Sequence, residues 1–244
     1  MAQMSATAIE AAVAGGAQTA VVVAGSVEQH GPHLPCDTDT VYGTELARRL
    51  ATRLGSALVA PLIVPGCSDH HLGFGGTFTI GPELLVAQAE AHLRSLGRMG
   101  FATVVLTSSH GGNFGPLYEA LPHLRAVAAE YGMRLVDVLS LADFVAALRK
   151  VPAERGLDQG IPAVQADLIE TSIMLYLRPD LVRMDLAEAG HMRPFDIDEL
   201  FASGLKPLTA NGILGDPRGA TAELGEAIVA ALEEYLVAAV GEKM

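Results

Sequence analysis

Cysteines, aromatic residues and basic residues are all scarce in this sequence. Its 244 residues include two cysteines and no tryptophan, and 16 lysines and arginines stand against 28 acidic residues. Two cysteines are too few for a disulfide framework and fit a reducing compartment. The net charge of −12 argues against a nucleic-acid partner and against an anionic membrane surface, because both require a basic face.

Long apolar runs and two common enzyme motifs are absent as well. No run approaches the roughly 20 apolar residues of a membrane helix, and the N-terminus lacks the basic region and continuous apolar core of a signal peptide. We therefore expect a cytoplasmic protein. Neither the G-x-S-x-G motif of serine hydrolases nor a Walker sequence occurs, which disfavours a serine hydrolase and a nucleotide site.

Short apolar segments alternate with amphipathic ones along the chain. The segments with the β-branched, apolar character of buried strands are 19–25, 57–66, 101–109 and 133–141. Prolines in the second of these confine the strand to its ends or place it at a sheet edge. The expected helices are about 40–54, 81–100, 115–132, 142–150, 163–177 and 221–240, with a polar loop at 151–162.

This alternation, without an obvious repeat or linker, predicts an α/β fold. We expect a single three-layer domain over residues 1–244, with a mostly parallel sheet between helices. In such sheets, ligands bind beyond the carboxyl ends of the strands. Two polar segments, 25–40 and 110–113, directly follow predicted strands, so we expect the active site to form there.

The segment GSVEQHGPHLPCDTDT, residues 25–40, gathers acidic and imidazole side chains. Glu28 and His30 are separated by one residue, so they project to one side of an extended chain. With Asp39 and with His110 from the next polar segment, they form an oxygen and nitrogen set that suits Zn²⁺, Mn²⁺ or Fe²⁺ better than Ca²⁺. The alternative is a polar loop with a capping aspartate and a solvated glutamate.

Two other places hold polar groups that need an explanation. In the segment SDHHLGFGGT, residues 68–77, Asp69, His70 and His71 could ligate a metal, but they fit the wall of a substrate site better. Glu170 lies in the apolar helix ADLIETSIML. A carboxylate in such a helix is either at the edge of the apolar face or buried with a partner, and a metal ion is one such partner.

Five motifs, taken in order, resemble those of the creatininase (creatinine amidohydrolase) family. They are EQHGPHLPCDTD (28–39), SDHHLGFGGT (68–77), SHGGN (109–113), ETS (170–172) and GILGDPRGAT (212–221). The resemblance runs from about residue 20 to the C-terminal helix. It implies an α/β metalloenzyme that hydrolyses C–N bonds in small cyclic or linear amides and often forms hexamers or other homo-oligomers. It also implies two divalent metal ions; we expect zinc, with manganese or iron as alternatives.

The resemblance assigns ligand roles to individual residues. Glu28 would ligate one metal ion and His30 the other, Asp39 would bridge them, and His110 would join Glu28. Creatininase has a glutamate two residues after that histidine, where this chain has Gly112. We expect Glu170 to replace that ligand.

The remaining site predictions concern the substrate. Gln165 stands where many family members have a histidine that binds substrate or moves protons. We expect Ser68, Asn113 and Gln165 to contact the substrate, and Glu170 or His71 to return a proton to the leaving nitrogen. The departures at positions 112 and 165 argue against creatinine as the substrate.

Three functions are compatible with these motifs. We favour a metal-dependent hydrolase of a small or cyclic amide. A peptidase that matures a ribosomal peptide is the first alternative, because one branch of the family trims the precursor of mycofactocin. A non-catalytic metal-binding or ligand-binding protein of the same fold is the second, because Gln165 would permit it.

Overall fold

Four parallel strands form the central sheet of the protein, whose computed structural model describes residues 1–244. The strands are β1 (Thr19–Ala24), β2 (Ala57–Val59), β3 (Thr103–Ser108) and β4 (Arg134–Val138). Their order across the sheet is β2-β1-β3-β4. The prolines predicted that the second strand would be confined to its ends or lie at a sheet edge. The edge position is confirmed, since β2 is a three-residue strand at the edge of the sheet.

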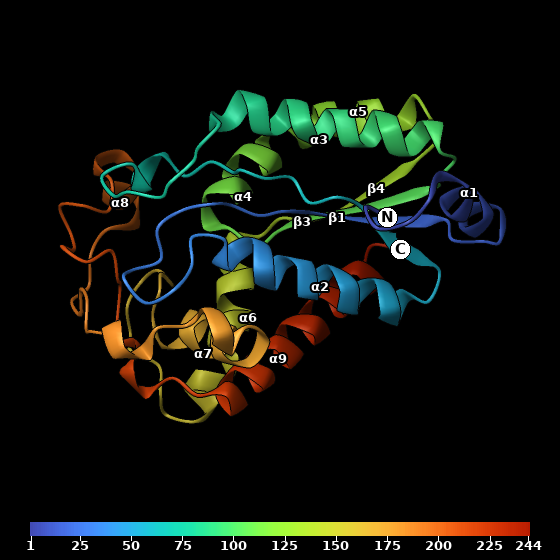
Figure 1. The fold of residues 1–244 in the computed structure, drawn as a ribbon. Helices are drawn as coiled ribbons and strands as arrows, with labels where there is room; N and C mark the ends of the chain where they lie inside the picture. Colours follow the sequence, from blue (N-terminus) through green and yellow to red (C-terminus); the bar gives the residue numbers. More distant parts are fainter.

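Nine α-helices surround the sheet: α1 (Ala6–Ala14), α2 (Thr38–Leu54), α3 (Gly81–Arg98), α4 (Gly111–Glu119), α5 (Leu121–Ala129), α6 (Leu141–Glu154), α7 (Leu168–Leu177), α8 (Ile197–Ser203) and α9 (Ala222–Gly241). Helices α3 and α5 lie on one face of the sheet, and α2 and α9 lie on the other (Figure 1). Helices α6 and α7 pack against α9. The predicted three-layer α/β fold with a parallel sheet is therefore confirmed.

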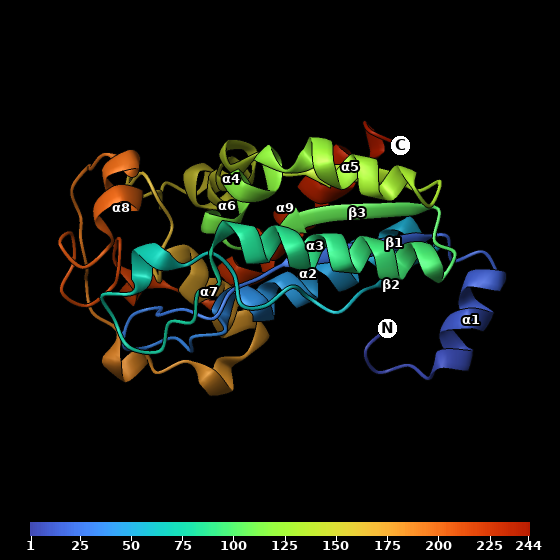
Figure 2. The same ribbon diagram turned by 90° about the horizontal axis from the view of Figure 1, so that it is seen from above.

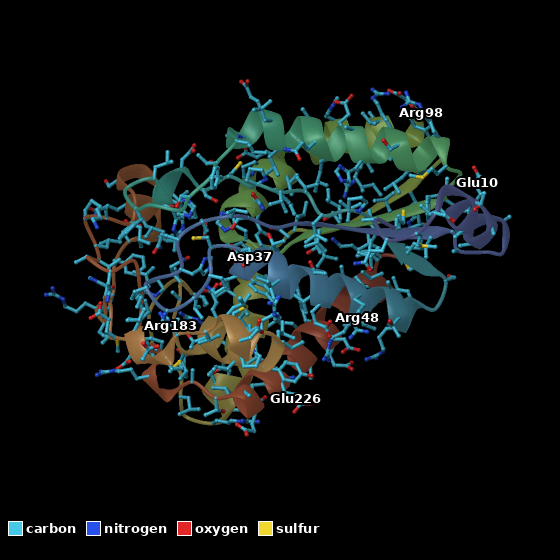
Figure 3. The ribbon with its side chains drawn as sticks, viewed as in Figure 1. Glu10, Asp37, Arg48, Arg98, Arg183 and Glu226 are labelled. Carbon is cyan, nitrogen blue, oxygen red and sulfur yellow. The ribbon has the colours of Figure 1, made fainter.

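The core occupies both faces of the sheet. Every residue of β1 is buried, and so are the last five residues of β3, as expected for strands covered by helices on both sides. Many charged side chains lie at the outside of the molecule, as the exposed Glu10, Arg98, Arg183 and Glu226 illustrate (Figure 3). None of the helices combines the length and the apolar character that crossing a membrane requires.

Several predicted element boundaries were wrong. The helix expected at 115–132 is two helices that meet at Ala120, because Pro122 in the first turn of α5 lacks the N–H that a continuous helix needs. Helix α6 continues to Glu154 through part of the expected polar loop. Helix α7 begins at Leu168 rather than at residue 163, since Ala166 has a φ of 52° and Asp167 caps the helix. Helices α1 and α8 were not predicted.

The carboxyl ends of the strands point toward α8, whereas α1 lies at the opposite end of the sheet (Figure 2). The loops after β1 and β3 leave the sheet at this carboxyl end, as does the loop that leads from β2 to α3. The polar segments 25–40, 109–113 and 68–77 lie in these loops and in the first turns of α2 and α4. The topology therefore brings segments that are distant in sequence to one edge of the sheet.

Candidate metal centre and its cavity

Five candidate ligands from four parts of the chain meet in the interior of the protein. The side chains come from the loop after β1, the first turn of α2, the residue before α4 and the first turn of α7. They are Glu28, His30, Asp39, His110 and Glu170, and all five are buried. Burial of so many ionisable groups is costly unless their charges are offset, so the cluster requires a physical explanation.

His30 faces three carboxylates. Its Nε2 lies 3.6 Å from Asp39 Oδ1, 3.7 Å from Glu170 Oε2 and 4.0 Å from Glu28 Oε1. Its Nδ1 lies 3.0 Å from the Glu28 carbonyl oxygen and is placed to donate to it. A histidine held in this way at one nitrogen presents the other to a metal ion. Burial would lower the pKa of His30, but Asp39 and Glu170 raise it well above its usual value, so this position favours a positive charge.

His110 contacts the other side of the same carboxylates. Its Nδ1 lies 3.0 Å from Asp39 Oδ2, and its Nε2 lies 3.4 Å from Glu28 Oε2. Burial would lower the pKa of His110, but Glu28 and Asp39 raise it to about 9. Burial would raise the pKa of Asp39, but His30 and His110 lower it below its usual range. Asp39 thus lies between the two histidines, where a bridging carboxylate would be.

Polar atoms without partners mark the centre of the cluster. Both carboxylate oxygens of Glu28 and the Nε2 of His30 are buried and have no hydrogen-bond partner. Burial raises the pKa of Glu28 to about 7, and it does the same for Glu170. Buried polar atoms are rarely left without partners. A divalent cation would satisfy these atoms and offset the carboxylate charges, so the residues present fit a metal ion.

His70 is a candidate ligand that the sequence analysis had assigned to the substrate wall. Two groups of three side chains have ligand atoms within 4.8 Å of one another, namely Glu28 with His30 and Asp39, and Glu28 with His70 and His110. The two groups share Glu28, which suits a site for two ions. The signal in the sequence was the histidine pair in SDHH, but sequence alone could not tell which ring faces the cluster.

Gly112 leaves no room for the glutamate that creatininase has after its histidine. A Cβ atom at Gly112 would lie 2.1 Å from the Cys67 carbonyl oxygen, 2.7 Å from His110 Nε2 and 3.0 Å from His70 Cε1. The segment with Cys67 and His70 therefore fills this space. The structure instead brings Glu170 beside His30, as expected for a replacement ligand, and the ligand role itself remains a prediction.

Two of the residues predicted to contact the substrate do not line the cavity beside the cluster. Ser68 is fully buried, with its Oγ 3.3 Å from His110 Nε2. Asn113 is also fully buried, because its side-chain amide binds the backbone of Gly25 and Cys67 at 3.0 and 2.9 Å. In the structure, Ser68 contacts a candidate ligand and Asn113 holds together the loops that carry the cluster, and substrate contact by either residue remains a prediction.

His71 and Gln165 do line the cavity. His71 Nε2 lies 3.3 Å from Glu28 Oε1, and burial together with His70 and His110 lowers the pKa of His71 well below its usual value. Gln165 Nε2 donates to the Gln29 carbonyl at 2.9 Å. Both side chains would therefore adjoin a molecule bound in the cavity.

The cavity has a volume of about 490 Å³ and a largely apolar wall. Glu28, Asp39, His110 and Glu170 form part of its lining. Most of the remaining lining is apolar and comes from α6, α8 and the segments around them, including Leu141, Phe144, Val145, Ile197, Leu200 and Phe201. No lysine or arginine lines it. A molecule bound here would meet acidic and imidazole groups at one end and apolar side chains elsewhere.

A family model and relatives of known function both match nearly the whole chain. The model of the creatininase family, described as creatinine amidohydrolase, matches residues 2–240. A mycofactocin precursor peptide peptidase from Mycobacterium tuberculosis (strain ATCC 25618 / H37Rv) is 34% identical over 235 residues, which cover 92% of this chain and 85% of the relative. Creatinine amidohydrolase from Pseudomonas putida is 30% identical, and the match covers 96% of this chain and 93% of that protein.

Solved structures lead to the same family. A crystal structure of creatinine amidohydrolase (creatininase) has a TM-score of 0.80 and 27% identity, covering 100% of this chain and 96% of its own. A mutant creatininase described as the Zn-Zn type has a TM-score of 0.81 and 27% identity, with 100% and 97% covered. The match of the family model over nearly all residues, together with relatives at 30% identity and above, shows that this chain belongs to the creatininase family.

Proposed function

We propose that the protein is a divalent-metal-dependent hydrolase of C–N amide bonds. The observation that carries this proposal is the buried cluster in which Glu28 and His30 keep unpartnered ligand atoms at the end of a cavity. Relatives named as an amidohydrolase and as peptidases support hydrolysis. A relative structure of the Zn-Zn type and another described as creatininase Mn support zinc or manganese as the metal.

Different residues of the chain would hold the two metal ions of such a centre. Glu28, Asp39 and His110 would hold one ion, and His30 with Asp39 and Glu170 would hold the other, with His70 as a further candidate ligand. Two divalent ions bound here would supply polarisation of an amide carbonyl and an acidified water. Ser26 donates to Asp39 Oδ2 at 2.7 Å, and Ser109 donates to the Asp39 carbonyl at 2.7 Å. These bonds would fix the orientation of the bridging carboxylate.

The cavity favours an amide that carries apolar groups over creatinine. Its wall is mostly apolar, whereas creatinine is a small polar ring that would leave most of this wall uncovered. A peptide segment with apolar side chains would fill about 490 Å³ and keep water away from the ions. A peptidase is therefore the second candidate function, and the mycofactocin precursor peptide peptidases among the relatives support it.

Metal analysis followed by a substrate screen tests the proposal. Purified protein should retain zinc or manganese, and it should hydrolyse a member of a panel of amides that includes creatinine and short apolar peptides. A chelator or the variant Glu28→Gln should abolish this hydrolysis. Protein that binds no divalent ion would refute the proposal. Protein that binds metal but hydrolyses no amide would support the non-catalytic alternative.

We also infer that the protein acts as a homo-oligomer in the cytoplasm. Large apolar side chains are exposed in the loop before α3 and on α3 and α4, with Phe78 65%, Leu84 59% and Tyr118 61% accessible. Apolar side chains exposed in this way often mark subunit interfaces. The low cysteine content supports a reducing compartment.

A further inference from the structure

Gln29 lies between two candidate ligands in sequence, but its side chain contacts a different residue. Its Nε2 lies 3.1 Å from His71 Nδ1 and 3.1 Å from the Gly212 carbonyl oxygen. Its Oε1 accepts a hydrogen bond from the Gly31 N–H at 3.0 Å. Gln29 and His71 are both buried, so water does not compete for these contacts.

Two backbone groups determine which end of the Gln29 amide faces His71. The Gly31 N–H can only donate, so the atom next to it is the amide oxygen; the Gly212 carbonyl can only accept, so the atom next to it is the nitrogen. Gly212 has a φ of 80°, and a Cβ atom there would lie 1.9 Å from Gln29 Oε1. The loop thus encloses the amide closely, and the amide cannot turn over without losing both bonds.

The orientation of this amide determines which ring nitrogen of His71 carries the proton. An amide NH₂ group is a donor only, so the His71 Nδ1 that faces it must carry a lone pair. A neutral imidazole then carries its single proton on Nε2. That nitrogen lies 3.3 Å from Glu28 Oε1, and both residues line the cavity.

We propose that Gln29 is a positioning residue that fixes His71 as the Nε2–H tautomer, so that His71 acts as a neutral hydrogen-bond donor to a substrate bound beside Glu28. In this tautomer, Nε2 is protonated and cannot ligate a metal ion. By distance, His70 belongs to a group of candidate ligands and the adjacent His71 does not, which agrees with a His71 that does not ligate. The catalytic part of the proposal rests on the proposed function, whereas the tautomer does not.

The tautomer also revises the expected role of His71 as a proton donor. Loss of the Nε2 proton from a neutral ring would leave an imidazolate, and a proton gained at Nδ1 would point at the Gln29 NH₂ group. His71 is therefore suited to neither proton transfer. A neutral imidazole N–H can instead stabilise negative charge that develops on a substrate oxygen. Glu170 remains the candidate for proton transfer.

Nitrogen-15 NMR of protein labelled at histidine tests this proposal without reference to activity. The variant His71→Gln assigns the resonances of His71 among the eight histidines. In the wild type, with and without zinc, we expect Nδ1 to have the shift of an unprotonated nitrogen and Nε2 that of a protonated one. A wild-type spectrum with the His71 proton on Nδ1 would overturn the proposal.

The variant Gln29→Met keeps the size of the side chain but removes its donor. We expect a second His71 tautomer in this variant and a loss of about 10-fold in kcat. The control Gln159→Met removes a glutamine that also binds backbone at both ends, to Asp216 at 2.7 and 2.8 Å, but contacts no histidine. It should keep the single tautomer. An unchanged tautomer in Gln29→Met would overturn the role of Gln29. Absence of amide hydrolysis in the wild type would refute the proposed function and leave the tautomer result standing.

Discussion

Replacement of Glu170 by glutamine tests the part of the metal centre that departs from creatininase. Burial raises the pKa of Glu170 from 4.5 to about 7, so ionisation of this carboxylate at neutral pH costs about 3 kcal/mol when no cation offsets it. Glutamine keeps the shape of the side chain and removes the charge. The variant therefore separates the contribution to metal binding from the contribution to folding.

The Glu170→Gln substitution should affect stability and metal binding in opposite directions. At pH 7.5, the metal-free Glu170→Gln variant should be as stable as the metal-free wild type, or up to about 3 kcal/mol more stable, because a buried charge is lost. Its zinc stoichiometry should fall from two ions to one, or the weaker site should lose about 100-fold in affinity. Glu170 Oε2 lies 3.7 Å from His30 Nε2, so the substitution removes a negative charge from the His30 side of the cluster.

The assay combines zinc titration with denaturation. Competition with a chromophoric chelator measures both affinities, and urea unfolding with and without a chelator measures stability. Glu226→Gln is the control, because Glu226 is an exposed glutamate on α9. If Glu170→Gln binds two zinc ions as tightly as the wild type, Glu170 is not a ligand. A metal-loaded crystal structure would then show its oxygens beyond coordination distance.

The remaining predictions concern the other ligand, pH, packing and assembly. His30→Ala should lose bound metal and activity together, and full metal occupancy in that variant, measured by mass spectrometry, would contradict the assignment. As the pH rises from 4.5 to about 7, the metal-free wild type should lose up to about 3 kcal/mol more stability than Glu170→Gln. The reason is that folded Glu170, with its pKa of about 7, keeps a proton that the unfolded chain has released. An equal change in the free energy of unfolding of the two proteins between pH 5 and 7.5, measured with urea, would refute this. Gly112→Ala should lower the free energy of unfolding by about 1 to 3 kcal/mol and weaken metal binding, because its Cβ would lie 2.1 Å from the Cys67 carbonyl oxygen. An unchanged melting temperature would count against this packing. Light scattering should give a mass well above the 25.4 kDa of one chain, and a monomer across a wide concentration range would exclude the homo-oligomer.

The layered fold could be predicted because the strands differ sharply from the helices in composition. Segments such as TAVVVA and TVVLTS are uniformly apolar and β-branched, and they became β1 and β3. Boundaries that depend on single backbone conformations were missed. No residue pattern indicated that Ala166 would have a positive φ, which delays the start of α7 by five residues relative to the prediction.

The candidate site was predicted in part. The positions of Glu28, His30, Asp39 and His110 followed from strand ends, and Glu170 from the resemblance and its apolar helix. The difference between His70 and His71 could not be predicted, because adjacent residues in a short 3₁₀ turn point in different directions. The hydrogen bonds of the Asn113 amide to the backbone of two loops could not be predicted either, because its partners Gly25 and Cys67 are distant in the sequence.

The hydrogen bonds that Asn113 makes to two loops affect how the candidate metal centre assembles during folding. Its amide joins the end of β1, at Gly25, to the β2–α3 loop, at Cys67, and Cys67 in turn accepts from the candidate ligand His110. These partners come from three separate parts of the chain, around Gly25, around Cys67 and at 110–113, so a binding-competent site cannot exist until β1, β3 and the loop have come together. Zinc uptake by a refolding chain would therefore report completed tertiary structure rather than helix formation. Metal ions would bind the folded state alone and shift the folding equilibrium toward it.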